Sequence, residues 1–328
     1  MKPKQLKRFL MSAFAARENV LIKGRPGVGK SDIVAAAAKD AGCELIISHP
    51  VVSDPVDYKG MPHIYEGKAD FIPFGELRRI IDAKVPTVFF LDDLGQASPS
   101  VQSACMQLLL ARRINEFKVS DQVTFVAATN RREDKANVNG ILEPVKSRFA
   151  SIVELNVNSD DWCEWAARNE VPHELISFIR FRPDLIDKDI VASKDIVNSP
   201  SPRTLAALGR IHKLVDHEIR YEAYSGAVGE AFATEYIAFL TTYNQLPSFD
   251  DIVNDPSGVP VPTDPGLLYA ISGLLANKVN KENAISVMSY MARLPIEIQV
   301  SALKSFNPST MVIKEVAAWF VNNGHIFL

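Results

Sequence analysis

The chain has 328 residues, of which 47% are hydrophobic and 23% are charged, and its net charge is −3. Such a composition is typical of a globular protein with a substantial core, and the negative net charge argues against a generally basic nucleic-acid binder. No apolar run approaches the roughly 18 residues that a membrane span needs, so we expect no membrane segment.

The first 157 residues alternate strand-like and helix-like segments. We expect strands at 20–23, 44–48, 87–91, 123–128 and 151–155, and helices at 31–41, 74–84 and 99–113. The third and fourth strands are almost continuously apolar, as are strands buried on both faces of a parallel sheet. The sequence therefore predicts a three-layer αβα core with a parallel five-stranded sheet, a core that the next connection assigns to the P-loop NTPase type.

The connection after the first strand matches the phosphate-loop pattern G-x-x-x-x-G-K followed by Ser or Thr. Its residues are Gly24, Arg25, Pro26, Gly27, Val28, Gly29, Lys30 and Ser31. The glycines let backbone N–H groups surround a triphosphate, Lys30 reaches the β- and γ-phosphates, and Ser31 is a ligand of Mg²⁺. A chance glycine-rich turn is the alternative, but the flanking strand and helix favour a nucleoside triphosphate site.

Between the second and third strands, residues 61–75 could form a hairpin that turns at Glu66 and Gly67. Tyr65 and Phe71 would then be able to touch a substrate, although a packed surface hairpin is the simpler interpretation.

Polar residues follow the two apolar strands. Asp92 can hold Mg²⁺ and Asp93 can orient or deprotonate the attacking water, whereas the alternative is a solvated acidic turn. Asn130, at the tip of the next strand, can position that water or can be an ordinary turn residue. Arg148 and Arg203 can supply positive charge to the γ-phosphate, although either could be a surface arginine.

Two arginine pairs, Arg112 with Arg113 and Arg131 with Arg132, are expected to lie on the surface, with a subunit interface as the alternative. Three widely spaced cysteines lack the spacing of a metal site. We expect them to be reduced core thiols, which favours the cytoplasm; they are Cys43, Cys105 and Cys163.

After about residue 158 the strand pattern stops. Helices are expected from 159, at 173–180 and 201–214, and near 228–243, 266–277, 281–293, 295–305 and 309–322, with a loop at roughly 246–265. We therefore divide the chain into an αβα nucleotide-binding core, residues 1–157, and an α-helical lid with a C-terminal helical extension, residues 158–328.

The order of these motifs resembles that of an AAA+ ATPase, and two segments are similar to the MoxR-like branch within the dynein-related group. Residues 91–104 look like the segment L-D-E-x-N-x-A-x-P-x-x-Q-x-A of that branch. Residues 53–62 look like its D-P-x-D-x-x-G stretch. The resemblance covers about residues 15–210.

This resemblance implies roles that the residues alone do not establish. It gives the phosphate loop and Asp92 the functions derived above and makes Asn130 the residue called sensor 1. Arg148 matches the arginine finger, which acts on ATP held by the neighbouring subunit, and Arg203 matches sensor 2. The resemblance thus implies a homo-oligomeric ring, usually a hexamer, with ATP and Mg²⁺ at each boundary, and it places residues 61–75 where the branch has an insertion facing the pore or a partner.

The sequence departs from the family at two positions. Asp93 stands where the family has Glu, and the missing methylene could move the base ~1 Å or more from its water and slow hydrolysis. Gln96 replaces the family's usual Asn. We expect ATP hydrolysis to survive, because both side chains keep their chemical class.

The leading hypothesis is an ATPase ring that remodels or activates a partner protein, for which the resemblance suggests a von Willebrand factor A-type protein. One alternative is a nucleic-acid-linked motor or restriction-type subunit, which the negative charge disfavours. Another is a nucleotide-controlled scaffold with weak hydrolysis, suggested by Asp93. ATP is preferred over GTP because no guanine-reading element is apparent.

Overall fold

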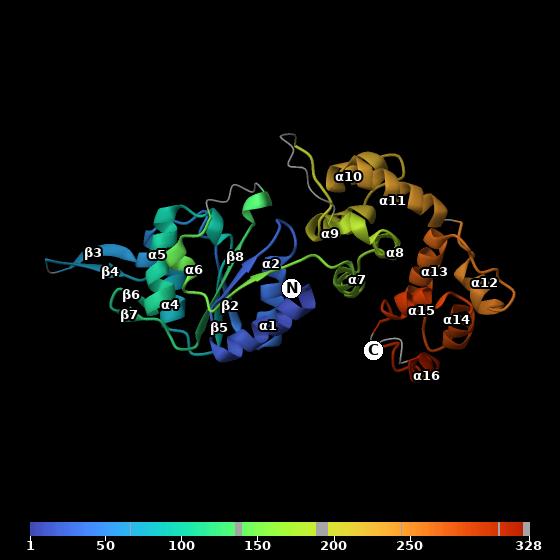
Figure 1. Cartoon of the computed structure of the whole chain (residues 1–328), viewed down its shortest axis with the longest axis horizontal. Coiled ribbons are helices and arrows are strands. Elements are labelled where there is room, and N and C mark those ends of the chain that lie inside the picture. The colour runs from blue at the N-terminus through green and yellow to red at the C-terminus, as the bar shows by residue number, and fades with distance from the viewer. Residues whose placement is uncertain (66, 135–139, 188–195, 244, 308, 324–328) are drawn as a thin grey trace. The chain divides into compact units, whose positions relative to one another are not determined.

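The computed structural model describes residues 1–65, 67–134, 140–187, 196–243, 245–307 and 309–323 (Figure 1). The chain forms two units, Met1–Val157 and Asn158–Leu328. Two predictions for the hairpin at 61–75 lie outside the described part of the chain. They are the turn at Glu66 and the substrate contact of the Tyr65 side chain. Each unit is described here by itself.

The first unit is built on one five-stranded sheet, in the order β2-β5-β8-β1-β9. The strands are β1 (Val20–Lys23), β2 (Glu44–Ser48), β5 (Thr87–Leu91), β8 (Val123–Thr129) and β9 (Ser151–Glu154). All neighbouring pairs are parallel, so the carboxyl ends of the strands meet at one edge. The predicted parallel five-stranded sheet is confirmed.

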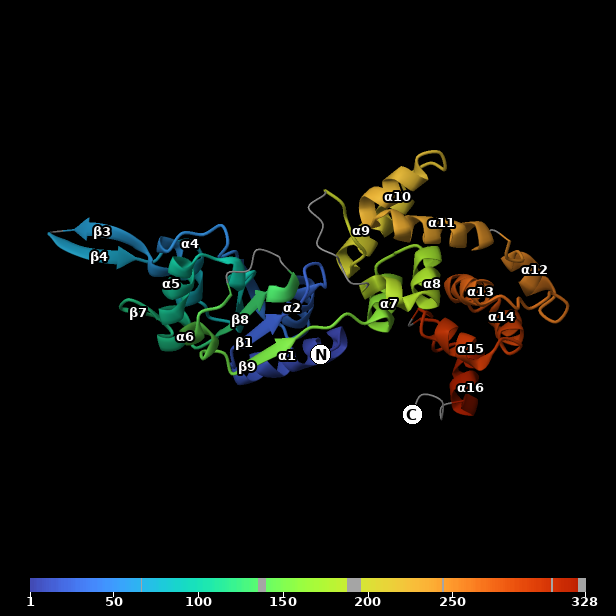
Figure 2. The ribbon, with the colours of Figure 1, turned by 45° about the horizontal axis from the view of Figure 1, so that its top comes forward.

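Helices cover both faces of this sheet (Figure 2). Val88 and Phe90 of β5 join one core, with α1 (Pro3–Ala16) and α2 (Lys30–Asp40). Phe89 and Leu91 join the opposite core, with α4 (Gly75–Ile81) and α5 (Pro99–Ala111). Successive side chains of a strand point to opposite faces, so a strand covered on both sides must be apolar throughout. Helix α1 was not among the predicted helices.

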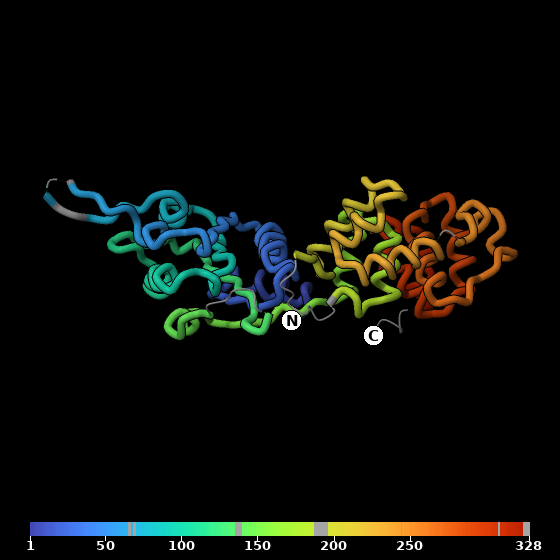
Figure 3. The backbone as a smooth tube through the Cα atoms, turned by 90° about the horizontal axis from the view of Figure 1, so that it is seen from above, coloured from blue at the N-terminus to red at the C-terminus, as the bar shows by residue number. Residues whose placement is uncertain are grey.

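Two hairpins extend the first unit. The strands β3 (Met61–Tyr65) and β4 (Lys68–Ile72) are antiparallel and follow the short helix α3 (Val56–Lys59). The predicted hairpin is therefore present, and it projects from the rest of its unit (Figure 3). A smaller hairpin of β6 (Arg113–Ile114) and β7 (Phe117–Lys118) follows α5, which ends at Ala111 rather than at residue 113.

The second unit is helical throughout its described residues. Its helices are α7 (Ser159–Arg168), α8 (His173–Phe181), α9 (Pro202–His212), α10 (Arg220–Val228), α11 (Glu230–Tyr243), α12 (Phe249–Asn254), α13 (Pro265–Lys278), α14 (Ala284–Met291), α15 (Ile296–Leu303) and α16 (Lys314–Asn323). The fold class, an αβα core followed by helices, is thus confirmed.

One expectation in this unit was wrong, because helix α12 lies inside the segment predicted to be a loop. The hydroxyl of Ser248 caps this helix by accepting a hydrogen bond from the backbone N–H of Asp251 at 3.1 Å. Ile252 is fully buried in the core of α12 to α16. A side-chain cap and one buried anchor are enough to hold a single helical turn or two against a core.

The cysteines are free thiols. Cys105 and Cys163 are fully buried, and burial raises the pKa of Cys105 to about 12 and that of Cys163 to about 11. Cys43 is only partly buried, so the expectation of a core thiol holds for two of the three.

None of the described helices is long and apolar enough to cross a membrane.

Candidate functional site

The phosphate loop lies at the carboxyl edge of the sheet, between β1 and α2. Its backbone adopts φ values of 76° at Gly27 and 92° at Gly29, a region that residues with a Cβ rarely occupy. A Cβ added at Gly29 would meet no atom within 4 Å, so the backbone conformation, and not crowding, is what requires glycine there. The loop ends at the N-terminus of α2, where N–H groups can receive an anion.

Lys30 occupies the centre of this site, and its side chain is buried. Its ammonium donates hydrogen bonds to the carbonyl oxygens of Gly24 at 2.9 Å and Arg25 at 3.0 Å. It also donates to Oδ1 of Asn130 at 2.7 Å, across 100 residues of sequence. The structure therefore brings the predicted phosphate-binding lysine and the predicted water-positioning amide into contact.

The two predicted magnesium ligands also meet. The hydroxyl of Ser31, in the first turn of α2, donates to Oδ2 of Asp92 at 2.7 Å. Asp92 directly follows β5, and its backbone N–H donates a hydrogen bond to the carbonyl of Ser48 at 2.9 Å. A hydroxyl and a carboxylate side by side are the oxygen donors that Mg²⁺ accepts.

Asp93 lies beside the same amide. Its backbone has φ 57° and ψ 34°, a left-handed conformation that turns the chain sharply after β5. Nδ2 of Asn130 lies 3.5 Å from Oδ1 of Asp93, a long contact for a hydrogen bond. The side chain of Asn130 is buried, with 8% of the residue exposed. Its amide oxygen faces Lys30 and its amide nitrogen faces Asp93. An amide in this position can hold a water between a cation and a base.

The two predicted arginines are Arg148 in the first unit and Arg203 in the second. Arg148 follows the short helix α6 (Glu143–Lys146), and among the described residues no hydrogen bond or ion pair joins its side chain to the phosphate loop. Its Nε is buried and has no partner in the described part of the chain. Arg203 is an exposed residue in the first turn of α9, in the second unit, and its predicted role stays a prediction.

Tyr58, in α3, contacts the end of β2 at this edge of the sheet. It is 2% exposed, and its hydroxyl shares a hydrogen bond with Oγ of Ser48 at 2.9 Å. Burial raises its pKa to about 12, so the phenol stays neutral. The carbonyl of Ser48 accepts a hydrogen bond from the N–H of Asp92. Through Ser48, Tyr58 therefore helps to fix the position of Asp92, which is a structural role for α3.

Gln102 has a structural role that its place in the segment 91–104 does not indicate. Its side chain is 1% exposed and ties α5 to the chain that leads to Arg148. Nε2 donates to the carbonyls of Ala97 at 3.1 Å and Gly140 at 2.9 Å, and Oε1 accepts from the N–H of Leu142 at 3.0 Å. No pattern in the sequence distinguishes such a glutamine from an exposed one.

Replacing Gln102 with methionine should destabilise the chain. The variant keeps the side-chain length but leaves up to three backbone groups without partners, which costs about 2 kcal/mol or more. We expect the midpoint of thermal unfolding to fall by about 5 °C. Scanning calorimetry measures it, with Gln107→Met on the exposed face of the same helix as control. Equal midpoints for the two variants would contradict this role of Gln102.

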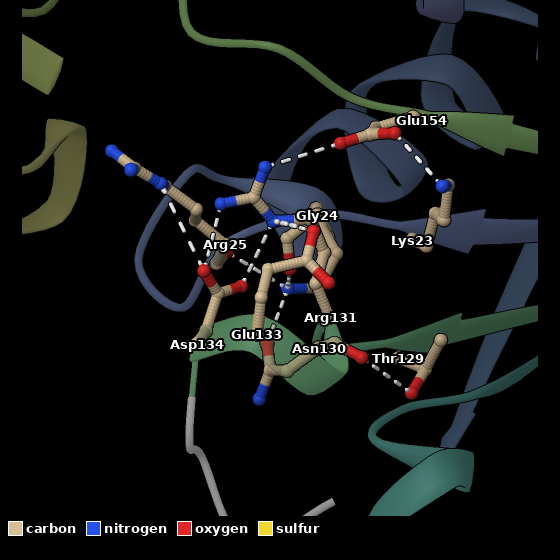
Figure 4. Close-up of polar contacts among 10 residues, drawn as sticks. Lys23, Gly24, Arg25, Thr129, Asn130, Arg131, Glu133, Asp134 and Glu154 are labelled. Carbon is tan, nitrogen blue, oxygen red and sulfur yellow. Dashed lines mark hydrogen bonds and ion pairs between the residues drawn. The ribbon is translucent and has the colours of Figure 1, made fainter. Parts of the chain in front are cut away.

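Arg131 was expected on the surface, and this expectation was wrong. Figure 4 shows its guanidinium among three carboxylates next to the phosphate loop, those of Glu133, Asp134 and Glu154, and its side chain is 19% exposed. Asp134 lies three residues after Arg131, so this contact is local. Glu154 reaches Arg131 because β8 and β9 lie on either side of β1 in the folded sheet. The sequence pattern does not indicate this second contact.

One protein-family model matches part of the chain. Residues 20–157 match the model of the "ATPase family associated with various cellular activities (AAA)". No curated protein sequence matches the chain. Among solved structures, a point variant of RuvB from Thermotoga maritima is 17% identical with a TM-score of 0.44, covering 83% of this chain and 80% of that one. NtrX from Brucella abortus is 12% identical with a TM-score of 0.42, covering 93% and 68%. These structural similarities are too distant to support a functional conclusion.

Proposed function

We propose that this chain is a MoxR-like ATPase that works as a homo-oligomeric, hexameric ring. The match of residues 20–157 to the AAA ATPase family model supports the ATPase part of this proposal. In this proposal, ATP hydrolysis drives the remodelling or activation of a partner protein. The observation that carries the ATPase part is the cluster of Lys30, Asn130 and the Ser31–Asp92 pair at one edge of the sheet.

The side chains at this edge fit Mg²⁺ and ATP. Lys30 would hold the β- and γ-phosphates, and the N–H groups of residues 24–31 would surround them. Ser31 and Asp92 would hold Mg²⁺, since their oxygens already lie 2.7 Å apart. When bound, the metal neutralises negative charge on the phosphates.

Hydrolysis would use the acidic residue and the amide together. Asp93 would accept a proton from the attacking water, and Asn130 would hold that water, because its amide lies between Asp93 and Lys30. Arg148 would stabilise the charge on the γ-phosphate in the neighbouring copy, and Arg203 would reach the phosphate of its own copy.

Replacing Asp93 with asparagine tests whether the chain hydrolyses ATP. The amide cannot accept the proton, so we expect the rate of phosphate release to fall about 100-fold while Mg·ATP still binds. Phosphate release and nucleotide affinity measure the two effects. Asp82→Asn is the control, since that exposed carboxylate bonds only the side chain of Arg78 on its own helix. Equal rates for native protein and Asp93→Asn would instead favour the scaffold function.

The projecting hairpin of β3 and β4 supports a protein as the client. Its apolar side chains Met61, Ile64, Phe71 and Ile72 are exposed, Ile64 at 76%. Exposed apolar groups on a projecting element are typical of surfaces that bind other proteins. With Mg·ATP, the Asp93→Asn variant should retain a protein client that Lys30→Ala does not retain. Retention of duplex DNA on a filter at moderate salt, with no protein client, would favour the nucleic-acid alternative.

A further inference from the structure

A network of ion pairs lies beside the phosphate loop, at the carboxyl ends of β8, β1 and β9 (Figure 4). At its centre the guanidinium of Arg131 donates to both oxygens of Asp134, from Nε at 3.0 Å and from Nη2 at 2.7 Å. Its third nitrogen, Nη1, donates to Oε1 of Glu154 at 3.2 Å. One planar side chain thus joins the segment after β8 to the end of β9.

The network continues into the phosphate loop on one side and into β1 on the other. Oδ1 of Asp134 lies 3.9 Å from Nε of Arg25, inside the loop. Oε2 of Glu154 lies 2.9 Å from the ammonium of Lys23, the last residue of β1. Lys23 stands between Thr129 and Glu154 in the register of the sheet, so the ion pairs follow the strand ends.

The central pair of Arg131 and Asp134 differs from ordinary surface ion pairs in its burial. The side chains of Arg131 and Asp134 are 19% and 11% exposed. The helical pair of Arg78 and Asp82 has a similar distance, 2.7 Å, but its side chains are 56% and 53% exposed. Solvent screens exposed pairs strongly and shielded ones less.

Both central groups are held in their charged forms. The hydrogen bonds to Asp134 raise the pKa of the Arg131 guanidinium. Lys23, and then Arg131, lower the pKa of Glu154. Arg131 and Glu154 therefore stay charged around neutral pH.

Asn130 is the residue that this network fixes, because it lies between β8 and Arg131. Its carbonyl accepts a hydrogen bond from Oγ1 of Thr129 at 3.1 Å, and the carbonyl of Thr129 accepts from the N–H of Gly24 at 3.2 Å. We propose that Arg131 is a positioning residue for ATP hydrolysis, which holds the amide of Asn130 against Lys30 by locking the end of β8 to β9 and to the phosphate loop. This inference rests on the proposed hydrolysis at the same site.

The test measures ATP turnover of Arg131→Gln in two backgrounds. In the native background we expect kcat to fall about tenfold with KM changed by no more than about twofold, because the amide is misplaced and not removed. In the Asn130→Ala background the same substitution should lower kcat by no more than about twofold, since residues that act as a unit are not additive. For Arg131→Lys we expect a kcat between that of the native protein and that of Arg131→Gln. An ammonium cannot make both the bidentate contact with Asp134 and the third hydrogen bond, to Glu154. Arg78→Gln, which breaks the exposed pair, is the control and should leave kcat unchanged.

An equal loss of kcat in both backgrounds, or no loss in the native one, would overturn the inference. Hydrogen exchange gives a readout that needs no activity: Arg131→Gln should speed exchange of backbone amides in residues 24–30, and leave α4 unchanged. Unchanged exchange in residues 24–30 would also overturn it. If the native protein releases no phosphate above Lys30→Ala, the proposed function fails, and hydrogen exchange still decides whether Arg131 locks the loop.

Discussion

Replacing Lys30 with alanine is expected to abolish nucleotide binding and ATP hydrolysis. Its buried ammonium lies where the loop, α2 and Asn130 converge, and it would make two or more charged hydrogen bonds to phosphate, worth about 1.5–3 kcal/mol each. We expect the affinity for Mg·ATP to fall about 100-fold or more. Titration with a fluorescent nucleotide measures the affinity, and phosphate release measures the turnover.

The control for Lys30→Ala is Lys39→Ala, an exposed lysine near the end of the same helix. It removes the same charge and the same number of atoms but lies away from the loop. Thermal unfolding of both variants separates a lost ligand from a lost fold. If Lys30→Ala kept native affinity and turnover, the site would have to lie elsewhere in the chain.

Replacing Arg148 with alanine is expected to lower kcat about 1,000-fold while nucleotide binding is kept. The expected cause is that each arginine serves the ATP of the next copy in a ring, where charge on the γ-phosphate develops during hydrolysis. Its side chain makes no bond to the phosphate loop of its own chain among the described residues, as a group acting in trans would not. Turnover and affinity are measured as for Lys30→Ala.

Mixing two inactive variants tests the action in trans. An Arg148→Ala copy can bind ATP, and a Lys30→Ala copy can supply the missing arginine. In a random ring made from equal amounts, about a quarter of the boundaries combine the two functional halves, so about a quarter of the native activity should return. Mixed rings without any recovered activity would show that Arg148 does not complete the site of a neighbouring copy.

Much of the first unit follows from short-range sequence patterns. The apolar runs at 87–91 and 123–128 become the buried central strands β5 and β8, because a strand covered on both faces cannot carry exposed polar side chains. The phosphate loop can also be predicted from a short stretch of sequence, since its eight consecutive residues form one conformation that requires the glycines. Helix α12 shows the limit of such patterns. Its short sequence, with the capping residue Ser248 and one buried residue, Ile252, has the pattern of a loop, and only the surrounding core shows that it is a helix.

The fold class, the phosphate loop and the polar residues at the strand ends could be predicted from the chain alone, because each depends on neighbouring residues. Three contacts became apparent only in the folded chain: that of Asn130 with Lys30, that of Gln102 with the segment before Arg148, and that of Arg131 with Glu154. Each joins residues that are distant in the sequence. The burial and the hydrogen bonds of such a polar side chain depend on these distant groups, and residue type alone does not specify them.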